Sequence, residues 1–206
     1  MTDNTDQSRR LLLQTAAIAT VAAGISSEAR AQPAASGIVI PAAFTTPAVQ
    51  KPLPFDAMQV EGLSERLLTS HWQNNYGGSV TALNAVKQRL ASALADDAVQ
   101  PYVYNDLKRE HLLRTGSVVL HELYFANIGT TARDSELDAA LTSAFGSVAG
   151  WEREFRRIGA GLGGGSGWVM LGWNSHTRSL ENFWMWDHMH APVATVPLLV
   201  MDMYEH

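Results

Sequence analysis

The spacing of hydrophobic residues changes at a run of small residues, Gly163-Gly164-Gly165-Ser166-Gly167, and this change limits the fold more than any other feature. Before the run, from 62 to 94 and from about 105 to 127, apolar residues recur every three or four positions, as in amphipathic helices. After it, three short apolar runs separated by turn residues are typical of strands: 168–173, 180–186 and 198–201. The sequence therefore predicts an α+β fold, an N-terminal antiparallel helical hairpin followed by a C-terminal α/β domain with a three-stranded antiparallel sheet.

Local signals refine the helical part. Ser64 is the expected N-cap of the first helix, and Gly77-Gly78 is expected to weaken or kink that helix near its middle. A third helical segment, 135 to 161, opens with the capping-box-like Ser135-Glu-Leu-Asp138 and is interrupted at Phe145-Gly146-Ser147.

The first 31 residues have the features of a removable export signal. The pair Arg9-Arg10 leads into an apolar stretch, Leu11 to Ile25, and Ala29-Arg30-Ala31 is a small-x-small cleavage site. A mildly apolar, disordered tail is the alternative. We expect export to the periplasm by the twin-arginine route, without a stable membrane anchor because the apolar stretch is too short to span a bilayer.

The rest of the chain divides into three predicted segments. Residues 32–52 are rich in Ala, Pro and Thr without a sustained period, which predicts a flexible leader. The N-terminal helical hairpin domain is expected at 53–130 and the C-terminal α/β metal-binding domain at 131–206.

Composition excludes several kinds of site. The net charge of −5 gives no basic surface for nucleic acid, and the chain has no cysteine, so disulfides, thiolate metal sites and cysteine nucleophiles are excluded. Any metal must be held by His, Asp or Glu.

Candidate metal ligands come from both halves of the chain. Asp202 and His206 are four residues apart, a spacing that puts both side chains on one face if the chain turns helical there. The alternative is that Asp202 caps a helix and His206 is exposed. A hairpin packed on a sheet can bring His71 and His121 to this pair, and a site of three imidazoles and one carboxylate suits redox-active iron or manganese.

The residues around these four resemble the iron/manganese superoxide dismutase family over roughly Leu53 to His206. The matching stretches are Leu53-Pro54-Phe55, His71 at its spacing before Leu83-Asn84, His121-x-x-x-Phe125, Phe145-Gly146-Ser147, Gly165-Ser166-Gly167-Trp168 followed by Leu171, and Pro197-Leu-Leu-x-x-Asp202-x-x-Glu205-His206. The last stretch is the most specific of them.

The resemblance implies a superoxide dismutase that converts superoxide to dioxygen and hydrogen peroxide at one iron or manganese ion per chain. It implies that His71, His121, Asp202 and His206 are the ligands and that water or hydroxide fills the fifth position. Glu205 matches a glutamate that reaches across a dimer interface to the partner's ligand histidine, so a homodimer is implied.

The chain departs from the family in the residues around the ligands. Asn75 and Ser79 stand where the family has a histidine and a tyrosine, and Tyr204 stands where it has a tryptophan. On a regular helix the nearby Tyr76 would face about 100° away from the position of Ser79.

The family glutamine that binds the solvent ligand is missing both near Ser117 and near Trp186. His188 or His190 can substitute for it, and the alternative is that both are loop histidines. The outer positions to examine are therefore His188, Tyr204, Asn75 and Ser79. Because several of them are altered, the competing function is an exported metal-binding protein with the same fold and little or no dismutase activity. The family also continues for about a helix or two beyond the position of His206, so we expect the natural chain to continue.

Overall fold

The computed structural model describes residues 40–129 and 134–206, which belong to one unit of the chain, Ile38–His206. The predicted export signal, and the leader up to residue 39, lie outside the described residues. Within the described ranges, no helix combines the length and the apolar character that crossing a membrane requires.

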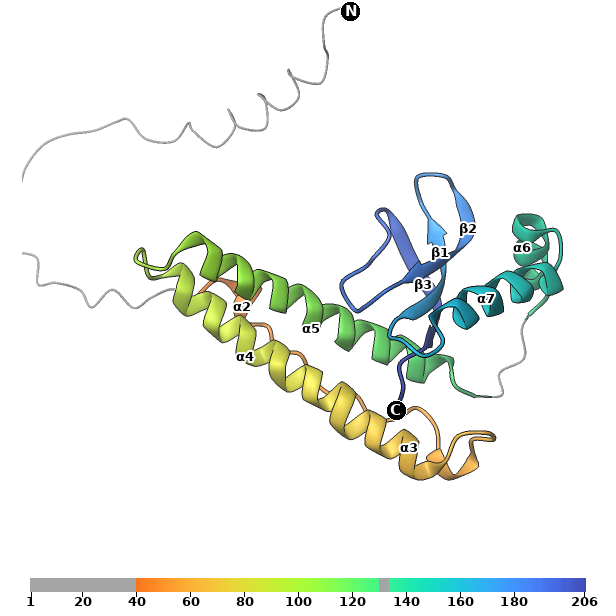
Figure 1. The fold of residues 1–206 in the computed structure, drawn as a ribbon, viewed down its shortest axis with the longest axis horizontal. Coiled ribbons are helices and arrows are strands. Elements are labelled where there is room, and N and C mark those ends of the chain that lie inside the picture. The colour runs from red at the N-terminus through yellow and green to blue at the C-terminus, as the bar shows by residue number, and fades with distance from the viewer. Residues whose placement is uncertain (1–39, 130–133) are drawn as a thin grey trace, which may run out of the picture. The chain divides into compact units, whose positions relative to one another are not determined.

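The N-terminal half is a helical hairpin (Figure 1). Its first arm consists of α3 (Glu65–Ser70), the π-helix η2 (His71–Tyr76) and α4 (Gly77–Leu94), and its second arm is α5 (Pro101–Asn127). Ser64 caps α3 as predicted, because its hydroxyl accepts a hydrogen bond from the Leu67 N–H at 3.2 Å. The second arm begins at Pro101 rather than near Asn105, since proline suits a first helical turn, where its missing N–H has no partner to lose.

The irregularity of the first arm precedes the glycine pair instead of falling on it. The turn from His71 to Tyr76 is π-helical, and α4 starts at Gly77. A neighbouring segment compensates for this loose turn, because the Gln50 side-chain amide donates to the Trp72 carbonyl at 2.9 Å and the Trp72 indole donates to the Lys51 carbonyl at 2.8 Å. The prediction of a kink at Gly77-Gly78 is thus corrected to a π-helical turn just before it.

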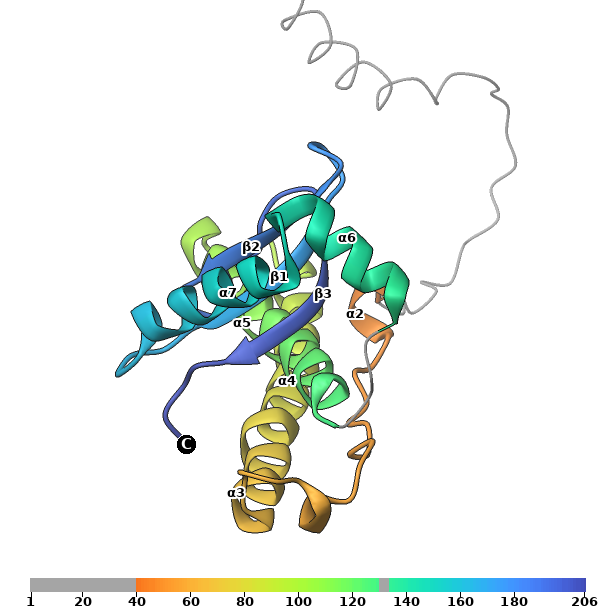
Figure 2. The ribbon, with the colours of Figure 1, turned by 90° about the vertical axis from the view of Figure 1, so that its right-hand side faces the viewer.

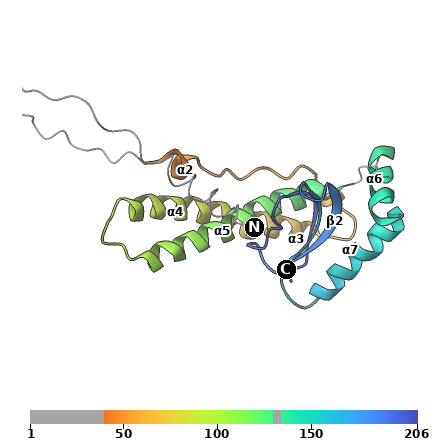
Figure 3. The same cartoon turned by 90° about the horizontal axis from the view of Figure 1, so that it is seen from above.

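Residues 40–59 run along the hairpin and contain two short helices, α2 (Ala42–Thr45) and η1 (Ala57–Gln59) (Figure 3). The Ala48 N–H donates to the Asn84 side-chain oxygen at 2.8 Å, and the Asn84 amide donates back to the Ala48 carbonyl at 2.9 Å. The prediction of a flexible leader is corrected for residues 40–52, because hydrogen bonds attach this segment to the helices.

The C-terminal half contains two helices and an antiparallel sheet whose strand order is β2-β1-β3. The predicted break between the helices is present, since Gly146 adopts a left-handed φ of 79°. The N-cap of the first helix is Asp134 rather than Ser135, because the Asp134 carboxylate accepts from the Leu137 N–H. The elements are α6 (Ser135–Phe145), α7 (Val148–Leu162), β1 (Trp168–Asn174), β2 (Ser179–Met185) and β3 (Thr195–Asp202).

The central strand β1 is buried on both faces. Trp168 and Met170 pack with residues of α5, whereas Val169 and Leu171 pack with residues of α6 and α7. The sheet therefore lies between the hairpin on one face and α6 and α7 on the other (Figure 2). The Val200 N–H also donates to the Asn127 side chain at the end of α5, at 3.0 Å, which places the end of β3 against the hairpin.

Candidate metal centre

The four candidate ligands come from three separate elements of the fold. His71 opens the π-helix η2, His121 lies on α5, Asp202 ends β3 and His206 follows four residues later. The last residues, 203–206, are not helical, so the helical spacing considered for Asp202 and His206 is not what brings them together. The chain instead curls back, and the His206 ring lies beside the His71 ring with centroids 3.9 Å apart.

One carboxylate oxygen, Asp202 Oδ2, is the centre of the cluster. It lies 3.2 Å from His71 Nε2, 3.2 Å from His206 Nε2 and 4.0 Å from His121 Nε2. Two donors that are each about 2.1 Å from one ion are separated by at most about 4.2 Å, and all three distances satisfy this limit. The ligand atoms of His71, His121 and Asp202 all lie within 4.8 Å of one another, and His206 joins this set through its contact with Asp202.

Three buried nitrogens of this cluster, both ring nitrogens of His71 and the Nε2 of His121, have no hydrogen-bond partner among the described residues. His71 and His121 are 1% and 2% exposed, and the Nε2 atoms of both rings are unpartnered. A buried polar atom without a partner costs about 1–3 kcal/mol, and a cation held between these nitrogens and Asp202 would remove that cost. The donor set therefore fits a transition metal ion.

The tautomer of His121 leaves its Nε2 free for a metal. The Nδ1 atom lies 2.7 Å from the Ser117 carbonyl oxygen, which can only accept, so Nδ1 carries the proton. Burial lowers the pKa of His121 to about 4, which keeps the ring neutral at physiological pH. A neutral imidazole whose second nitrogen is fixed by a carbonyl is the usual form of a histidine ligand.

Asp202 is ionised in the same environment. Burial raises its pKa, but the nearby His206 and His71 rings and the hydrogen bond from the Tyr204 N–H outweigh burial and hold the pKa well below its ordinary range. The Tyr204 N–H donates to Oδ1 at 2.8 Å, which leaves Oδ2 directed at the histidines. The centre thus has one full negative charge to balance a cation.

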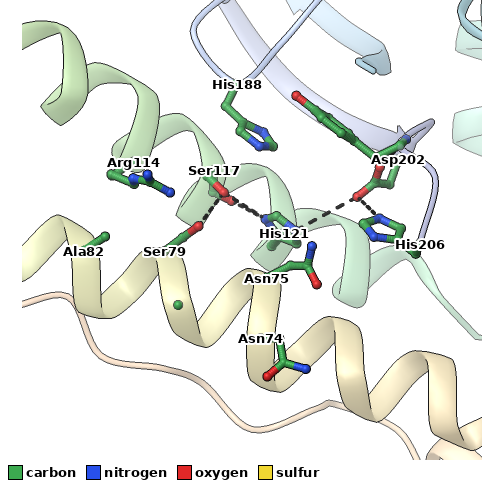
Figure 4. Close-up of a pocket in the computed structure, with 12 residues that line it drawn as sticks. Asn74, Asn75, Ser79, Ala82, Arg114, Ser117, His121, His188, Asp202 and His206 are labelled. Atoms are coloured by element: carbon green, nitrogen blue, oxygen red, sulfur yellow. Dashed lines mark hydrogen bonds and ion pairs between the residues drawn. The ribbon is translucent and has the colours of Figure 1, made fainter. Parts of the chain in front are cut away.

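A cavity of about 520 Å³ opens beside the cluster, between α4, α5 and the loop after β2 (Figure 4). All four outer residues considered from the sequence line it: Asn75, Ser79, His188 and Tyr204. The structure therefore gathers them at the metal centre.

Only one of the two loop histidines, His188, lines the cavity. His188 is on its wall, and its Nδ1 accepts a hydrogen bond from the Trp168 indole at 2.9 Å. Because an indole N–H can only donate, Nδ1 carries no proton and the ring proton is on Nε2; burial lowers the pKa of His188, which favours the same neutral ring. His190 is instead an exposed residue whose Nδ1 lies 2.9 Å from Asp187 Oδ1. Of the two alternatives, the structure places only His188 at the cavity.

Ser79 belongs to a short buried chain of hydroxyl groups. Its Oγ lies 2.8 Å from the Ser117 Oγ, which lies 3.3 Å from His121 Nδ1. Tyr76 does not take the place of the tyrosine that Ser79 replaces, because its hydroxyl donates to Glu122 at 3.0 Å and accepts from the Lys51 N–H, outside the cavity.

Arg114, which was not predicted from the sequence, is a cation on the cavity wall whose Nε donates to Glu110 at 2.7 Å. Ser117 was noted only as a position that lacks the family glutamine, and it also lines the cavity. Arg114 precedes His121 by seven positions, or two helical turns, and Ser117 precedes it by four, or one turn. Both therefore share the face of α5 on which His121 lies. That spacing was the available signal.

Comparison with known proteins agrees with this geometry. Residues 133–206 match the family model described as "Iron/manganese superoxide dismutases, C-terminal domain". The chain is 45% identical over 158 residues to "Superoxide dismutase [Fe]" of Cupriavidus metallidurans, covering 76% of this chain and 79% of that protein.

More distant relatives carry names with either metal. The chain is 29% identical over 140 residues to "Superoxide dismutase [Mn]" of Mycobacterium celatum, covering 66% of this chain and 99% of the relative. It is 26% identical over 161 residues to "Superoxide dismutase [Mn/Fe]" of Propionibacterium freudenreichii, covering 75% of this chain and 79% of the relative. Both the predicted fold class and the family resemblance are confirmed, and this chain belongs to the iron/manganese superoxide dismutase family.

Proposed function

We propose that the protein dismutates superoxide at one iron or manganese ion held by His71, His121, Asp202 and His206. The observation that carries the proposal is the pair of buried Nε2 atoms of His71 and His121, which face the Asp202 carboxylate and have no hydrogen-bond partner within residues 40–129 and 134–206. The relatives named for iron, for manganese and for both support a site that takes either metal.

A bound iron or manganese ion would provide redox chemistry at this site: one superoxide is oxidised to dioxygen, and the electron that it gives up reduces a second superoxide. Two protons are consumed with the reduced molecule, because hydrogen peroxide is the product. The task of the cavity wall is therefore to hold donors beside the centre.

His188 is the residue that we assign to this task. With Nδ1 occupied by the Trp168 indole, its Nε2–H is the free donor, and the ring lies 5.8 Å from the His121 ring. The hydroxyls of Ser79 and Ser117 add two groups that can donate or accept. Tyr204 supports this wall by stacking on the His188 ring, with centroids 4.9 Å apart.

The test is a dismutation assay on purified protein loaded with iron or with manganese. A rate well above that of an equal concentration of the free ion is expected, and His121→Ala serves as the metal-free control. Bound metal with a rate no better than the free ion would overturn the proposal and would favour the competing function, an exported metal-binding protein with little or no dismutase activity.

We also propose a homodimer that forms through the region of Glu205. In support, Glu205 is exposed and lines a second pocket of about 450 Å³, which the candidate ligands His71 and His206 also line. A mass of two chains in light scattering, reduced towards one chain in Glu205→Arg, is the expected result. A wild-type monomer would contradict it.

The proposed location is the periplasm, reached by the twin-arginine route, and its support is the sequence of residues 1–31 alone. Cell fractionation should recover the protein in the periplasm, and replacing Arg9 and Arg10 together by lysine should retain it in the cytoplasm. An unchanged distribution of the double variant would reject this route.

A further inference from the structure

The helix α5 touches the loop after β2 with its backbone, at Gly116. A Cβ atom added at this glycine would lie 1.7 Å from the His188 carbonyl oxygen and 2.8 Å from its carbonyl carbon. Since real Cβ atoms essentially never approach other heavy atoms more closely than 3.0 Å, only glycine fits here.

A glycine inside a long helix needs a reason, because it destabilises a helix by about 1 kcal/mol relative to alanine. Gly116 lies near the middle of the helix Pro101–Asn127 and has no left-handed conformation to explain it. The close approach of the His188 carbonyl is the explanation that the structure provides.

The loop that makes this approach is itself well defined. Asp187 Oδ1 accepts hydrogen bonds from the Met189 N–H at 2.6 Å and the His190 N–H at 3.3 Å, which closes a tight turn around His188. The turn presents the backbone of His188 to α5 and its ring to the cavity (Figure 4).

The ring is then fixed from two further directions. The Trp168 indole holds Nδ1 at 2.9 Å, and the Tyr204 ring stacks on the imidazole with an interplanar angle of 16°. Trp168 lies on the sheet and Tyr204 lies just after its last strand, so neither partner moves with the loop. The distance between the loop and α5 therefore decides whether the His188 ring lies where it can contact both of them.

We propose that Gly116 is a positioning residue for His188: by lacking a side chain it lets the loop rest on the helix at the depth where Trp168 fixes Nδ1 and Nε2–H points into the cavity. The effect on dismutation rests on the proposed function, whereas the effect on the tautomer of His188 does not. An alanine at 116 requires the carbonyl oxygen to withdraw by more than 1 Å, enough to break a 2.9 Å hydrogen bond.

The experiment compares Gly116→Ala with Gly161→Ala in the full-length, metal-loaded protein. Gly161 is the matched control, because it is also helical and a Cβ there meets nothing within 4 Å. We expect Gly116→Ala to keep its metal and its far-UV circular dichroism but to lose about ten- to a hundredfold in kcat, as outer-sphere changes do. Gly161→Ala should retain the wild-type rate.

Two readouts are independent of the dismutation rate. Nitrogen-15 NMR of the zinc-substituted protein should show His188 as the Nε2–H tautomer in the wild type and in Gly161→Ala, and a mixture of tautomers in Gly116→Ala. The affinity for azide, a small anion that probes the cavity, should fall only in Gly116→Ala.

A double variant tests whether the glycine acts through the ring. Once His188→Ala has removed the imidazole, adding Gly116→Ala should slow the enzyme no further, whereas independent effects would multiply. Multiplying effects, an unchanged tautomer in Gly116→Ala, or failure of that variant to fold would each overturn the proposal. If the loaded wild type does not dismutate superoxide, the proposed function fails, and the tautomer measurement still decides the role of Gly116.

Discussion

The two sides of the metal centre are built differently. On the ligand side, the buried Nε2 atoms of His71 and His121 have no hydrogen-bond partner in the part of the chain that the structure describes, so this side is incomplete until a cation is present. On the cavity side, His188, Ser79 and Ser117 all have hydrogen-bond partners within the protein.

The difference separates binding from reactivity. Ligand atoms without hydrogen-bond partners around a carboxylate provide affinity for a metal. The cavity wall, whose polar groups already hydrogen-bond within the protein, can be substituted without loss of that affinity. This agrees with the resemblance of the sequence to the family, in which the expected ligand positions match whereas Asn75, Ser79 and Tyr204 stand where the family is expected to have other residues. We therefore expect ligand substitutions to act on metal content and wall substitutions to act on rate.

The largest effect is expected for His121→Ala, which removes a ligand from the incomplete side. The variant should lose its metal, measured by elemental analysis, and its activity should fall to that of the buffer. The helix around it should persist, because Val118, Leu120 and Phe125 still pack in the core. A variant that keeps its full metal content would refute the ligand assignment.

Acid should weaken the metal-free protein through the same histidine. The pKa of His121 is 6.5 in the unfolded chain and about 4 in the folded one, so the unfolded chain takes up the proton first as the pH falls. The contribution of His121 to the free energy of unfolding is therefore fully present above pH 6.5. It is lost as the pH falls from 6.5 to 4, and the loss is about 3 kcal/mol.

Urea unfolding at several pH values measures this loss, and His121→Gln is the control that cannot titrate. The variant should show a shallower dependence on pH, although not a flat one, because burial also lowers the pKa of His188. An equally steep decline in both proteins would remove His121 as the cause.

How much of this was predictable depends on the range of the interactions involved. The hairpin and the strands follow from local periodicity, and they were predicted because one face of each helix and both faces of β1 are buried. The four candidate ligands were singled out because the residues around them resemble the motifs of the family, and the structure brings these four side chains together. The cap at Asp134 was missed by one residue, since two neighbouring side chains can both serve as an N-cap.

The features that escaped depend on contacts between distant residues. The π-helical turn carrying His71 is compensated by Gln50, 22 positions from its acceptor Trp72, and no local pattern reports that hydrogen bond. The choice of His188 over His190 depends on Trp168, 20 positions earlier, and on the approach to Gly116. Local sequence could name two histidines, and only the tertiary structure could select one.

A smaller effect is expected when the wall is changed at His188. His188→Ala should keep its metal and lose about ten- to a hundredfold in rate, because the Nε2–H donor is removed. His188→Gln should recover part of the rate, since the amide can still donate into the cavity. The steady-state rate and the metal content, measured on the same preparations, decide the point, and loss of metal from His188→Ala would place this residue on the ligand side of the comparison.

The smallest effect is expected at Ser79. Ser79→Ala removes one hydroxyl of a buried pair and leaves the Ser117 hydroxyl its contact with His121 at 3.3 Å, so the free energy of unfolding should fall by only about 1 kcal/mol. The metal should stay bound, and the rate should fall less than in His188→Ala, because the Nε2–H of His188 remains in place. Ser92→Ala, which removes an exposed hydroxyl bonded only to the Gln88 carbonyl, is the control for losing a helical serine. If Ser79→Ala instead slowed the reaction more than His188→Ala, the hydroxyl pair rather than the imidazole would be the main donor on the wall. The ligand side would still account for metal binding and the cavity side for the rate.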